Sequence, residues 1–360
     1  MGPGPSNVSE RVLAASARPT IGHLDPNFVQ LMDEIKTLTR YAFQTDNALT
    51  FPVSAPGSAG MEMCVVNLVE PGDKVIVCIN GVFGGRLKEN VERAGGVAVA
   101  VEDPWGRAVD PDKVRETFKA HPDARILAFV HAETSTGACS DVAALCGIAR
   151  EHDALTIVDT VTSLSGVELR VDDWGVDAAY SGSQKCLSCP PGLSPVTFSE
   201  RAVARMKQRK HKVQSWFLDL SLVIAYWEGD GARAYHHTAP VNAMYAMHEA
   251  LLALHDEGLE AAWQRHRQTH EQLREGLESL GFRYLVPAAE RLPQLNSVYL
   301  PDGVADEAAL RRHLLDEHHI EIGAGLGALA GKIWRIGLMG HTARSENVER
   351  CLAALKETLA

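Results

Sequence analysis

The run LTIVD at Leu155–Asp159 is short, apolar and β-branched, and it ends on a carboxylate. Runs of the same kind lie on both sides of it in the chain, each bounded by glycine, proline or charge, as strands buried on both faces of a sheet should be. Helix-like segments such as Gly85–Ala94 and Asp141–His152 separate them. The alternation predicts an α/β fold, a mainly parallel sheet with helices on both faces. The other runs are KVIVCI (Lys74–Ile79), VAVAV (Val97–Val101), RILAFV (Arg125–Val130) and PVTF (Pro195–Phe198).

The pattern changes after Thr238, where two long helices are expected at Val241–Glu257 and Leu259–Leu280, with Gly258 as the C-cap between them. A strand–helix–strand arrangement follows and indicates a second, smaller α+β domain. We expect an N-terminal arm at residues 1–20, a large domain at 21–255 and a small domain at 256–360. The elements expected in the small domain are strands at Phe282–Val286, Ser297–Leu300 and Lys332–Gly337, and a helix at Glu307–His318.

Composition excludes several classes of protein. A formal net charge of −11 over 360 residues argues against non-specific binding of nucleic acid, which needs a basic surface. No run of eighteen or more apolar residues is present, so we expect no membrane span. The seven scattered cysteines favour a reducing cytoplasm over a disulfide framework. Cys186 and Cys189 form a C-x-x-C without a second pair, so no metal site is predicted.

Lys185 ends the segment YSGSQK, which is made of small and uncharged residues. An isolated lysine is usually a solvated surface charge. Here the small residues before it, and Pro190–Gly192 after it, predict an irregular loop between strands, in which a planar ligand can approach the backbone. A partly desolvated lysine amine is a nucleophile toward aldehydes. Lys185 is therefore a candidate Schiff-base residue.

Asp159 ends the LTIVD run, and the carboxyl ends of buried parallel strands are where open α/β sheets bind ligands. A carboxylate there can hold the ring nitrogen of a cofactor in its protonated form. The alternative is a helix N-cap for Thr160–Ser163. The lysine that follows at Lys185 favours the functional interpretation.

Two further segments carry groups suited to anions. The small residues of Ser54–Gly60 (SAPGSAG) let backbone N–H groups and a helix N-terminus face an anion, although an ordinary strand–helix turn has the same composition. Arg335 lies inside the apolar run WRIGL, where a buried guanidinium needs a partner. A substrate carboxylate would be a bidentate partner, and a structural ion pair with Asp or Glu is the alternative.

At these four places together the chain resembles the class V aminotransferases of pyridoxal-phosphate fold type I, and within them the alanine–glyoxylate and serine–pyruvate group. The resemblance covers the whole chain in order. It implies a large domain with a mainly parallel seven-stranded sheet, helices on both faces, and a smaller C-terminal α+β domain. The motifs that carry it are GPGPSN (Gly2–Asn7), MDEIK (Met32–Lys36), HAETSTG (His131–Gly137), VDTVTS (Val158–Ser163), YSGSQK (Tyr180–Lys185), PPG (Pro190–Gly192), YHHT (Tyr235–Thr238), RLP (Arg291–Pro293) and WRIGLMG (Trp334–Gly340).

The cofactor implied by the resemblance is pyridoxal 5'-phosphate. Lys185 would hold it as a Schiff base and later transfer a proton, while Asp159 would pair with the ring nitrogen. The remaining implied cofactor contacts are Val161 under the ring, Phe83 on its other face, Thr134 at its phenolic oxygen, Gly57, Ser58 and Gln184 at the phosphate, and Tyr235 and Thr238 at the same phosphate from the neighbouring subunit of a homodimer.

The resemblance also implies a clamp for the substrate α-carboxylate, formed by Arg335 with Ser163 and the loop that ends at Asn7. The adjacent His236 and His237 point in different directions and are interpreted as interface or packing residues.

The implied reaction is a ping-pong transamination between a small amino acid, L-alanine or L-serine, and glyoxylate or another small 2-oxo acid. A single substrate arginine suits monocarboxylates, because a dicarboxylate needs a second cation. The alternatives within the cofactor class are serine–glyoxylate, aspartate-type and pyridoxamine–pyruvate transamination, and cysteine desulfuration. The alternative from another class is a binding protein on the same fold with an inert cofactor site.

Overall fold

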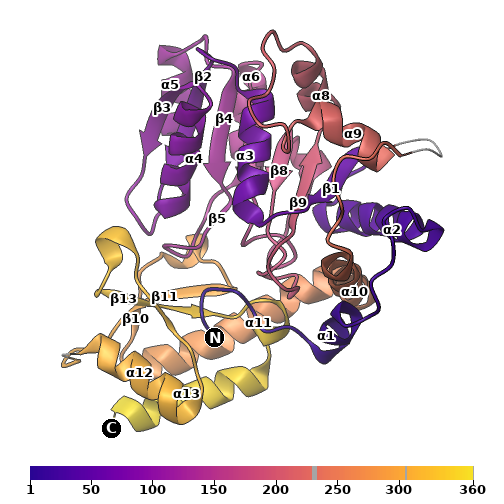
Figure 1. Ribbon diagram of the computed structural model, residues 1–360. Helices are drawn as coiled ribbons and strands as arrows, with labels where there is room; N and C mark the ends of the chain where they lie inside the picture. Colours follow the sequence, from indigo (N-terminus) through magenta and orange to yellow (C-terminus); the bar gives the residue numbers. More distant parts are fainter. Residues whose placement is uncertain (229–232, 305, 360) are drawn as a thin grey trace.

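The computed structural model describes residues 1–228, 233–304 and 306–359 (Figure 1). Its helices are α1 Glu10–Ser16, α2 Pro26–Phe43, α3 Gly57–Leu68, α4 Val82–Arg93, α5 Pro111–Ala120, α6 Val142–Glu151, α7 Val171–Trp174, α8 Glu200–Lys207, α9 Leu220–Glu228, α10 Val241–Glu257, α11 Leu259–Ser279, α12 Glu307–His318 and α13 Ser345–Leu359. Its strands are β1 Leu49–Val53, β2 Lys74–Ile79, β3 Val97–Glu102, β4 Ile126–Val130, β5 Ala132–Glu133, β6 Ala138–Cys139, β7 Leu155–Asp159, β8 Ala178–Tyr180, β9 Ser194–Phe198, β10 Arg283–Tyr284, β11 Leu295–Tyr299, β12 Gly323–Ala324 and β13 Ile333–Gly337.

The predicted fold class is confirmed. A seven-stranded sheet has the order β1-β9-β8-β7-β4-β2-β3, and the pairs from β8 to β3 are parallel. The helices α3 and α4 contact each other on one face of this sheet, and α5 and α6 contact each other on the other face (Figure 1). β9 runs antiparallel to both of its neighbours, β8 and β1. The apolar pattern of Ser194–Phe198 predicts a strand but carries no information on its direction.

The helices begin where the sequence offers a cap. The side chain of Asp141 accepts a hydrogen bond from the backbone N–H of Ala144, which confirms the predicted start of α6. Asp25 caps α2 in the same way, with Pro26 as the first helical residue. Gly258 separates α10 from α11 with φ of 85°, a left-handed conformation that favours glycine.

The second sheet has four antiparallel strands in the order β10-β11-β13-β12, and α11, α12 and α13 pack with it (Figure 1). The predicted helix at Glu307–His318 is confirmed at those bounds. The predicted strand at Phe282–Val286 is shorter, Arg283–Tyr284. Pro287 has no N–H to continue a ladder, and it leads into a 3-10 turn at Ala288–Glu290.

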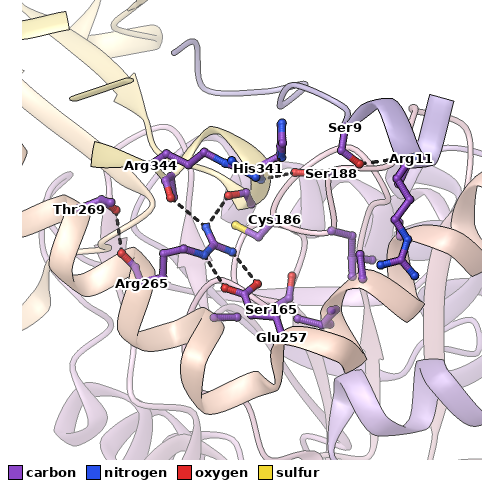
Figure 2. Close-up of a pocket in the computed structure, with 18 of the residues that line it drawn as sticks. Ser9, Arg11, Ser165, Cys186, Ser188, Glu257, Arg265, Thr269, His341 and Arg344 are labelled. Atoms are coloured by element: carbon purple, nitrogen blue, oxygen red, sulfur yellow. Dashed lines mark hydrogen bonds and ion pairs between the residues drawn. The ribbon is translucent and has the colours of Figure 1, made fainter. Parts of the chain in front are cut away.

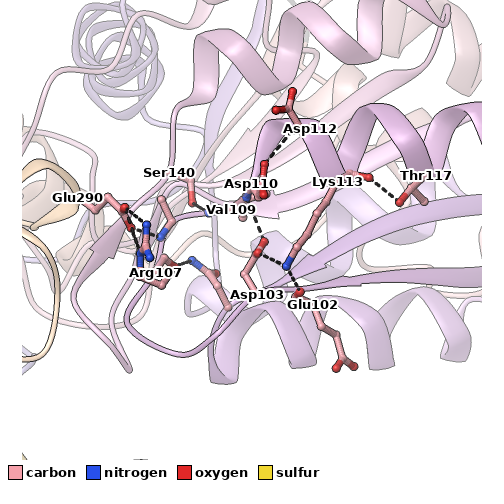
Figure 3. A network of polar contacts seen from close by, with 12 residues as sticks. Glu102, Asp103, Arg107, Val109, Asp110, Asp112, Lys113, Thr117, Ser140 and Glu290 are labelled. Carbon is pink, nitrogen blue, oxygen red and sulfur yellow. Dashed lines mark hydrogen bonds and ion pairs between the residues drawn. The ribbon is translucent and has the colours of Figure 1, made fainter.

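An ion pair joins the loop after β3, in the large sheet, to the 3-10 turn that follows β10, in the small sheet. The guanidinium of Arg107, in the loop after β3, donates to both carboxylate oxygens of Glu290, and the backbone N–H of Ala108 donates to the same carboxylate at 2.6 Å (Figure 3). The division into an arm, a large and a small domain at residues 20 and 255 remains our proposal. Its second boundary falls in the last turn of α10, just before Gly258. None of the helices in the described ranges is long and apolar enough to cross a membrane.

Candidate active site

A cavity of ≈ 240 Å³ lies at the carboxyl ends of the parallel strands. β7 delivers Asp159 to it, and the loop between β8 and β9 delivers Lys185. It brings together eight of the ten predicted cofactor residues, all except Tyr235 and Thr238. Its lining consists of Pro56, Gly57, Ser58, Met61, Phe83, Arg86, Ala132, Thr134, Asp159, Val161, Tyr180, Gln184 and Lys185.

Asp159 is buried and held by two hydrogen bonds. Its Oδ1 accepts from the backbone N–H of Val161 and its Oδ2 from the hydroxyl of Tyr180, both at 2.8 Å. Burial raises the pKa of Asp159 to about 7, although both hydrogen bonds favour the ionised form. A buried carboxylate of this kind is stabilised by a cation or a protonated ring nitrogen placed beside it. Tyr180 was not predicted to act here, and its position directly before SGSQK was the one available signal.

Lys185 is also buried, at 9% exposure. Burial lowers the pKa of its amine to about 8, so about a tenth of the amine is neutral and nucleophilic at pH 7, far more than at the ordinary pKa of 10.5. Its Nζ donates to the backbone carbonyl of Pro3, which the sequence did not single out. The arrangement can therefore support condensation with an aldehyde.

One end of the cavity is suited to an anion. Pro56 is the N-cap of α3 and provides no side-chain acceptor, so the first backbone N–H groups of the helix, at Gly57 and Ser58, face the cavity without a cap. The side-chain amide of Gln184 also lines the cavity, and its nitrogen can donate to an anion. These groups can hold a phosphate through N–H donors and the positive end of the helix dipole.

Apolar groups line the middle of the cavity, where Phe83 and Val161 are both partly buried. The guanidinium carbon of Arg86, one turn further along α4, lies 4.8 Å from the ring centroid of Phe83. Arg86 was not predicted. The hydroxyl of Thr134 contacts that of Thr162 within hydrogen-bond distance. A flat ring can pack between such groups while a hydroxyl reaches its edge.

Glu133 is a further residue of the site that was not predicted. Its carboxylate is fully buried, and it accepts from the backbone N–H groups of Phe83 and Gly84 at 3.2 and 3.3 Å and from Ser135. It thereby fixes the start of α4 and the ring of Phe83. A carboxylate inside the otherwise uncharged and mostly small HAETSTG segment was the signal for it.

Arg335 projects from β13 toward the same region. Its Nε donates to the carbonyl of Ala324 at 2.8 Å and its Nη1 to the carbonyl of Thr134 at 3.2 Å. Within the described ranges Arg335 forms no ion pair, which is contrary to the structural alternative considered for it. Burial lowers its pKa, and the charge of Glu133 opposes that effect. The buried hydroxyl of Ser163 also lacks a partner within those ranges.

Five predicted site residues do not line the cavity, namely Arg335 and Ser163, described above, and Asn7, Tyr235 and Thr238. Asn7 is exposed, and its backbone N–H donates to the hydroxyl of Thr342 at 3.3 Å. Tyr235 is 63% exposed and its hydroxyl lies 3.2 Å from that of Thr238. His236 stacks on Trp216, and His237 contacts Ser54 at 2.7 Å, so both histidines pack against aromatic or polar groups. The described residues contain no cluster that could hold a metal ion.

A second cavity, of ≈ 650 Å³, lies behind the lysine loop between α1, α10, α11 and the turn at residues 340–346 (Figure 2). It touches Cys186 and Ser188. Its most central cation, Arg265, is already compensated, because the guanidinium donates to Glu257 and to the carbonyls of Gly340 and Ala343. We therefore assign the chemistry to the first cavity.

The model of the family described as aminotransferase class-V matches residues 6–350. The chain belongs to the class V aminotransferases. This aminotransferase is 39% identical over its whole length to an alanine–glyoxylate aminotransferase of Drosophila melanogaster, 91% of which is covered. It is 38% identical, again over its whole length, to an (S)-ureidoglycine–glyoxylate transaminase of Bacillus subtilis, 90% of which is covered. Among solved structures, an alanine–glyoxylate aminotransferase from Nostoc sp. matches with a TM-score of 0.97 at 48% identity, covering 100% of this chain and 94% of that one.

Pyridoxal phosphate is the cofactor of this aminotransferase. The residues that line the cavity fit this cofactor. The uncapped start of α3 and the amide nitrogen of Gln184 suit the phosphate, and the buried Asp159 suits a protonated ring nitrogen. The buried amine of Lys185 suits the aldehyde.

Proposed function

We propose that this aminotransferase transfers an amino group between a small amino acid, L-alanine or L-serine, and glyoxylate or another small 2-oxo acid by a ping-pong mechanism. The observation that carries the proposal is Arg335. A buried guanidinium with no ion pair among the described residues, within reach of Thr134 at the edge of the cavity, provides a site for one substrate carboxylate. The names of the relatives at 38–39% identity support glyoxylate as the acceptor.

Lys185 has two roles in this proposal. Its amine holds the cofactor aldehyde and, once released, carries the proton between the substrate Cα and the cofactor. Burial, which lowers the pKa of Lys185 to about 8, suits both roles because the amine can gain and lose a proton near neutral pH. The catalytic residues in this proposal are Lys185 and Asp159.

When bound, pyridoxal phosphate supplies an aldehyde that condenses with amines and a ring that accepts electrons from the substrate Cα. Asp159 would hold the ring nitrogen protonated, and its two hydrogen-bond donors keep the carboxylate oriented for that task. Phe83 and Val161 would cover the two ring faces, and Thr134 would bond the phenolic oxygen. Gly57, Ser58 and Gln184 would hold the phosphate.

Tyr235 and Thr238 would complete the phosphate site from the second subunit of a homodimer. Both side chains are exposed and lie outside the cavity of their own chain, which supports this assignment. In the same proposal Ser163 and the loop ending at Asn7 assist Arg335 at the carboxylate. The predicted location in the cytoplasm stays a prediction.

Absorbance spectroscopy tests the function. The purified holoenzyme should show a visible absorbance band that bleaches with L-alanine and returns on addition of glyoxylate. A panel of amino donors and 2-oxo acceptors ranks the substrates. Lys185→Ala protein that kept full turnover would contradict the assignment, and a spectrum unchanged by any amino acid would favour an inert binding protein.

Cysteine desulfuration is the alternative for which the structure offers a specific test. That reaction needs an accessible, nucleophilic thiol. Cys186, next to the lysine, is buried, and burial raises the pKa of its thiol to about 12. We therefore expect 3-mercaptopyruvate, the transamination product that keeps the sulfur, and neither sulfide nor alanine when cysteine is tested as a donor.

A further inference from the structure

The first six residues of the predicted N-terminal arm, Met1–Ser6, which alone are called the arm from here on, run between the lysine loop and the sheet of the small domain. The chain starts beside that sheet in Figure 1. Residues at the two ends of the arm are bonded to different parts of the active site. The arm therefore connects the element that carries Lys185 with the strand that carries Arg335.

On the lysine side, Ser6 fixes the backbone of the loop. Its N–H donates to the carbonyl of Gln184 at 2.8 Å, and its hydroxyl donates to the carbonyl of Lys185 at 2.6 Å. The amine of Lys185 in turn donates to the carbonyl of Pro3. Backbone and side chain of the lysine are thus both held by the arm.

On the small-domain side, the N–H of Gly337 donates to the carbonyl of Met1 at 2.7 Å. The ring of Pro3 packs against Gly323, where a Cβ would lie 2.6 Å from the proline Cδ. Gly323 is the ladder partner of Arg335. The arm therefore contacts β13 within two residues of the guanidinium proposed to bind the substrate.

Gly4 lies directly against the lysine amine. A Cβ built on Gly4 would lie 2.5 Å from Nζ of Lys185, and the φ of Gly4 is +107°, where glycine is favoured. In the described part of the chain, the Pro3 carbonyl is the one acceptor that Nζ has. A buried ammonium without any acceptor is costly, so this contact matters for where the free amine rests.

We propose that the carbonyl of Pro3 and the bare Cα of Gly4 form a resting seat that holds the Lys185 ammonium whenever the lysine is not bonded to the cofactor. This inference rests on the proposed function, in which the lysine is bonded to the cofactor and is released from it once in each half-reaction. Pro3 and Gly4 are positioning residues in this scheme. Because the arm is also bonded to β13, the seat is coupled to the strand that carries Arg335.

Gly4→Ala tests the seat, because its methyl group would lie 2.5 Å from Nζ and 2.8 Å from Cδ of Lys185, so the free side chain has to leave its resting position. The released state loses a hydrogen bond to a charged group. We expect the amine concentration that half-bleaches the holoenzyme band at equilibrium to rise by about tenfold or more. The titration is made with L-alanine and, separately, with ethylamine, which displaces the lysine but has no carboxylate.

Two glycine variants serve as matched controls. Gly2→Ala alters the same arm, but its methyl group meets only the flexible carboxyl end of Glu321. Gly72→Ala introduces the same kind of backbone strain, at φ of +86°, with no atom within 4 Å of the new methyl group. Both should leave the midpoint within about twofold of the wild type. A shift for L-alanine alone would overturn the proposal in favour of an action of the arm on the substrate carboxylate, and an equal shift in a control variant would overturn it as well.

A second readout does not depend on cofactor or turnover. In cofactor-free protein, reductive methylation of Lys185 is followed by mass spectrometry in the wild type, in Gly4→Ala and in a variant lacking residues 1–5. We expect Lys185 to react about tenfold faster in both variants, because the amine has lost its acceptor and its cover. Unchanged labelling would overturn the seat. A wild-type band that no amine bleaches would refute the proposed function instead, and the labelling result would still decide the question of the arm.

Discussion

The hydroxyl of Tyr180 donates to Oδ2 of Asp159 at 2.8 Å, and this bond joins the last residues of two adjacent parallel strands, β7 and β8. The donor favours the ionised carboxylate. Tyr180→Phe should therefore raise the pKa of Asp159 above its value of about 7. The acidic limb of the kcat/KM profile should move to higher pH, and kcat at pH 7 should fall about tenfold. A profile identical to that of the wild type would show that the tyrosine does not act on the carboxylate.

Lys185 should set a pH dependence of cofactor uptake. Burial lowers the pKa of its amine from the ordinary 10.5 to about 8, so the neutral fraction rises through pH 8. Stopped-flow absorbance should show the rate of uptake rising with pH and reaching half of its plateau near pH 8. Between pH 8 and 10.5 the unfolded chain binds more protons at this lysine than the folded chain, so its contribution to stability should also rise with pH in that window. A midpoint near 10.5 would contradict the burial of the amine.

Arg335→Lys should weaken substrate binding strongly, although the substitution keeps the positive charge. Lysine cannot offer two parallel N–H donors to a carboxylate. We expect kcat/KM for L-alanine to fall about a hundredfold, mainly through KM, while the absorbance band of the cofactor is unchanged. Arg311→Lys, on α12 and paired with Glu307, is the control that should leave both constants unaltered.

Glu133→Gln probes the buried carboxylate behind Phe83. One of its oxygens accepts from two backbone N–H groups at the start of α4 and the other from the N–H and hydroxyl of Ser135. An amide nitrogen cannot accept, so glutamine leaves the donors on one side unpaired. The free energy of unfolding at pH 8, from urea titration, should fall by about 2 kcal/mol. Glu116→Gln on the exposed face of α5 should change the free energy of unfolding by no more than about 0.5 kcal/mol. Equal stability of the two variants would show that the carboxylate is not needed there.

The proposed dimer is tested by complementation. Lys185→Ala and Tyr235→Ala should each be weakly active alone, because each lacks one part of every site. A mixed dimer contains one site with both defects and one intact site. Co-refolding the two variants should therefore restore activity to about a quarter of the wild-type value, from the statistical share of mixed dimers. No recovery on mixing would indicate that Tyr235 acts within its own chain or not at all.

Much of the fold could be predicted from the sequence because apolar runs report burial directly. The strands at Lys74–Ile79 and Leu155–Asp159 and the helices at Val241–Glu257 and Glu307–His318 were predicted at their observed bounds. The direction of β9 could not be predicted, since an apolar run packs equally well either way. The site was predicted where a residue type is unusual in its surroundings, as for Lys185 and Arg335. Pro3 acts through its backbone carbonyl, which every residue type has, so the sequence could not single it out. The roles of Tyr180 and Glu133 depend on their positions beside Asp159 and Phe83, which only the folded structure gives.

The antiparallel course of β9 has a consequence for protein engineering. The loop that carries the lysine leaves the sheet at Tyr180 on β8 and returns to it at Ser194 on β9, the neighbouring strand. Both ends of the loop are therefore anchored side by side. How far the lysine extends into the cavity depends only on the backbone path of the loop between these two ends. Inserting residues would lengthen a tethered hairpin without moving its anchors. A designer who wants the reactive amine elsewhere in the cavity should transplant the lysine to another position of the loop and leave the number of residues between the two strands unchanged.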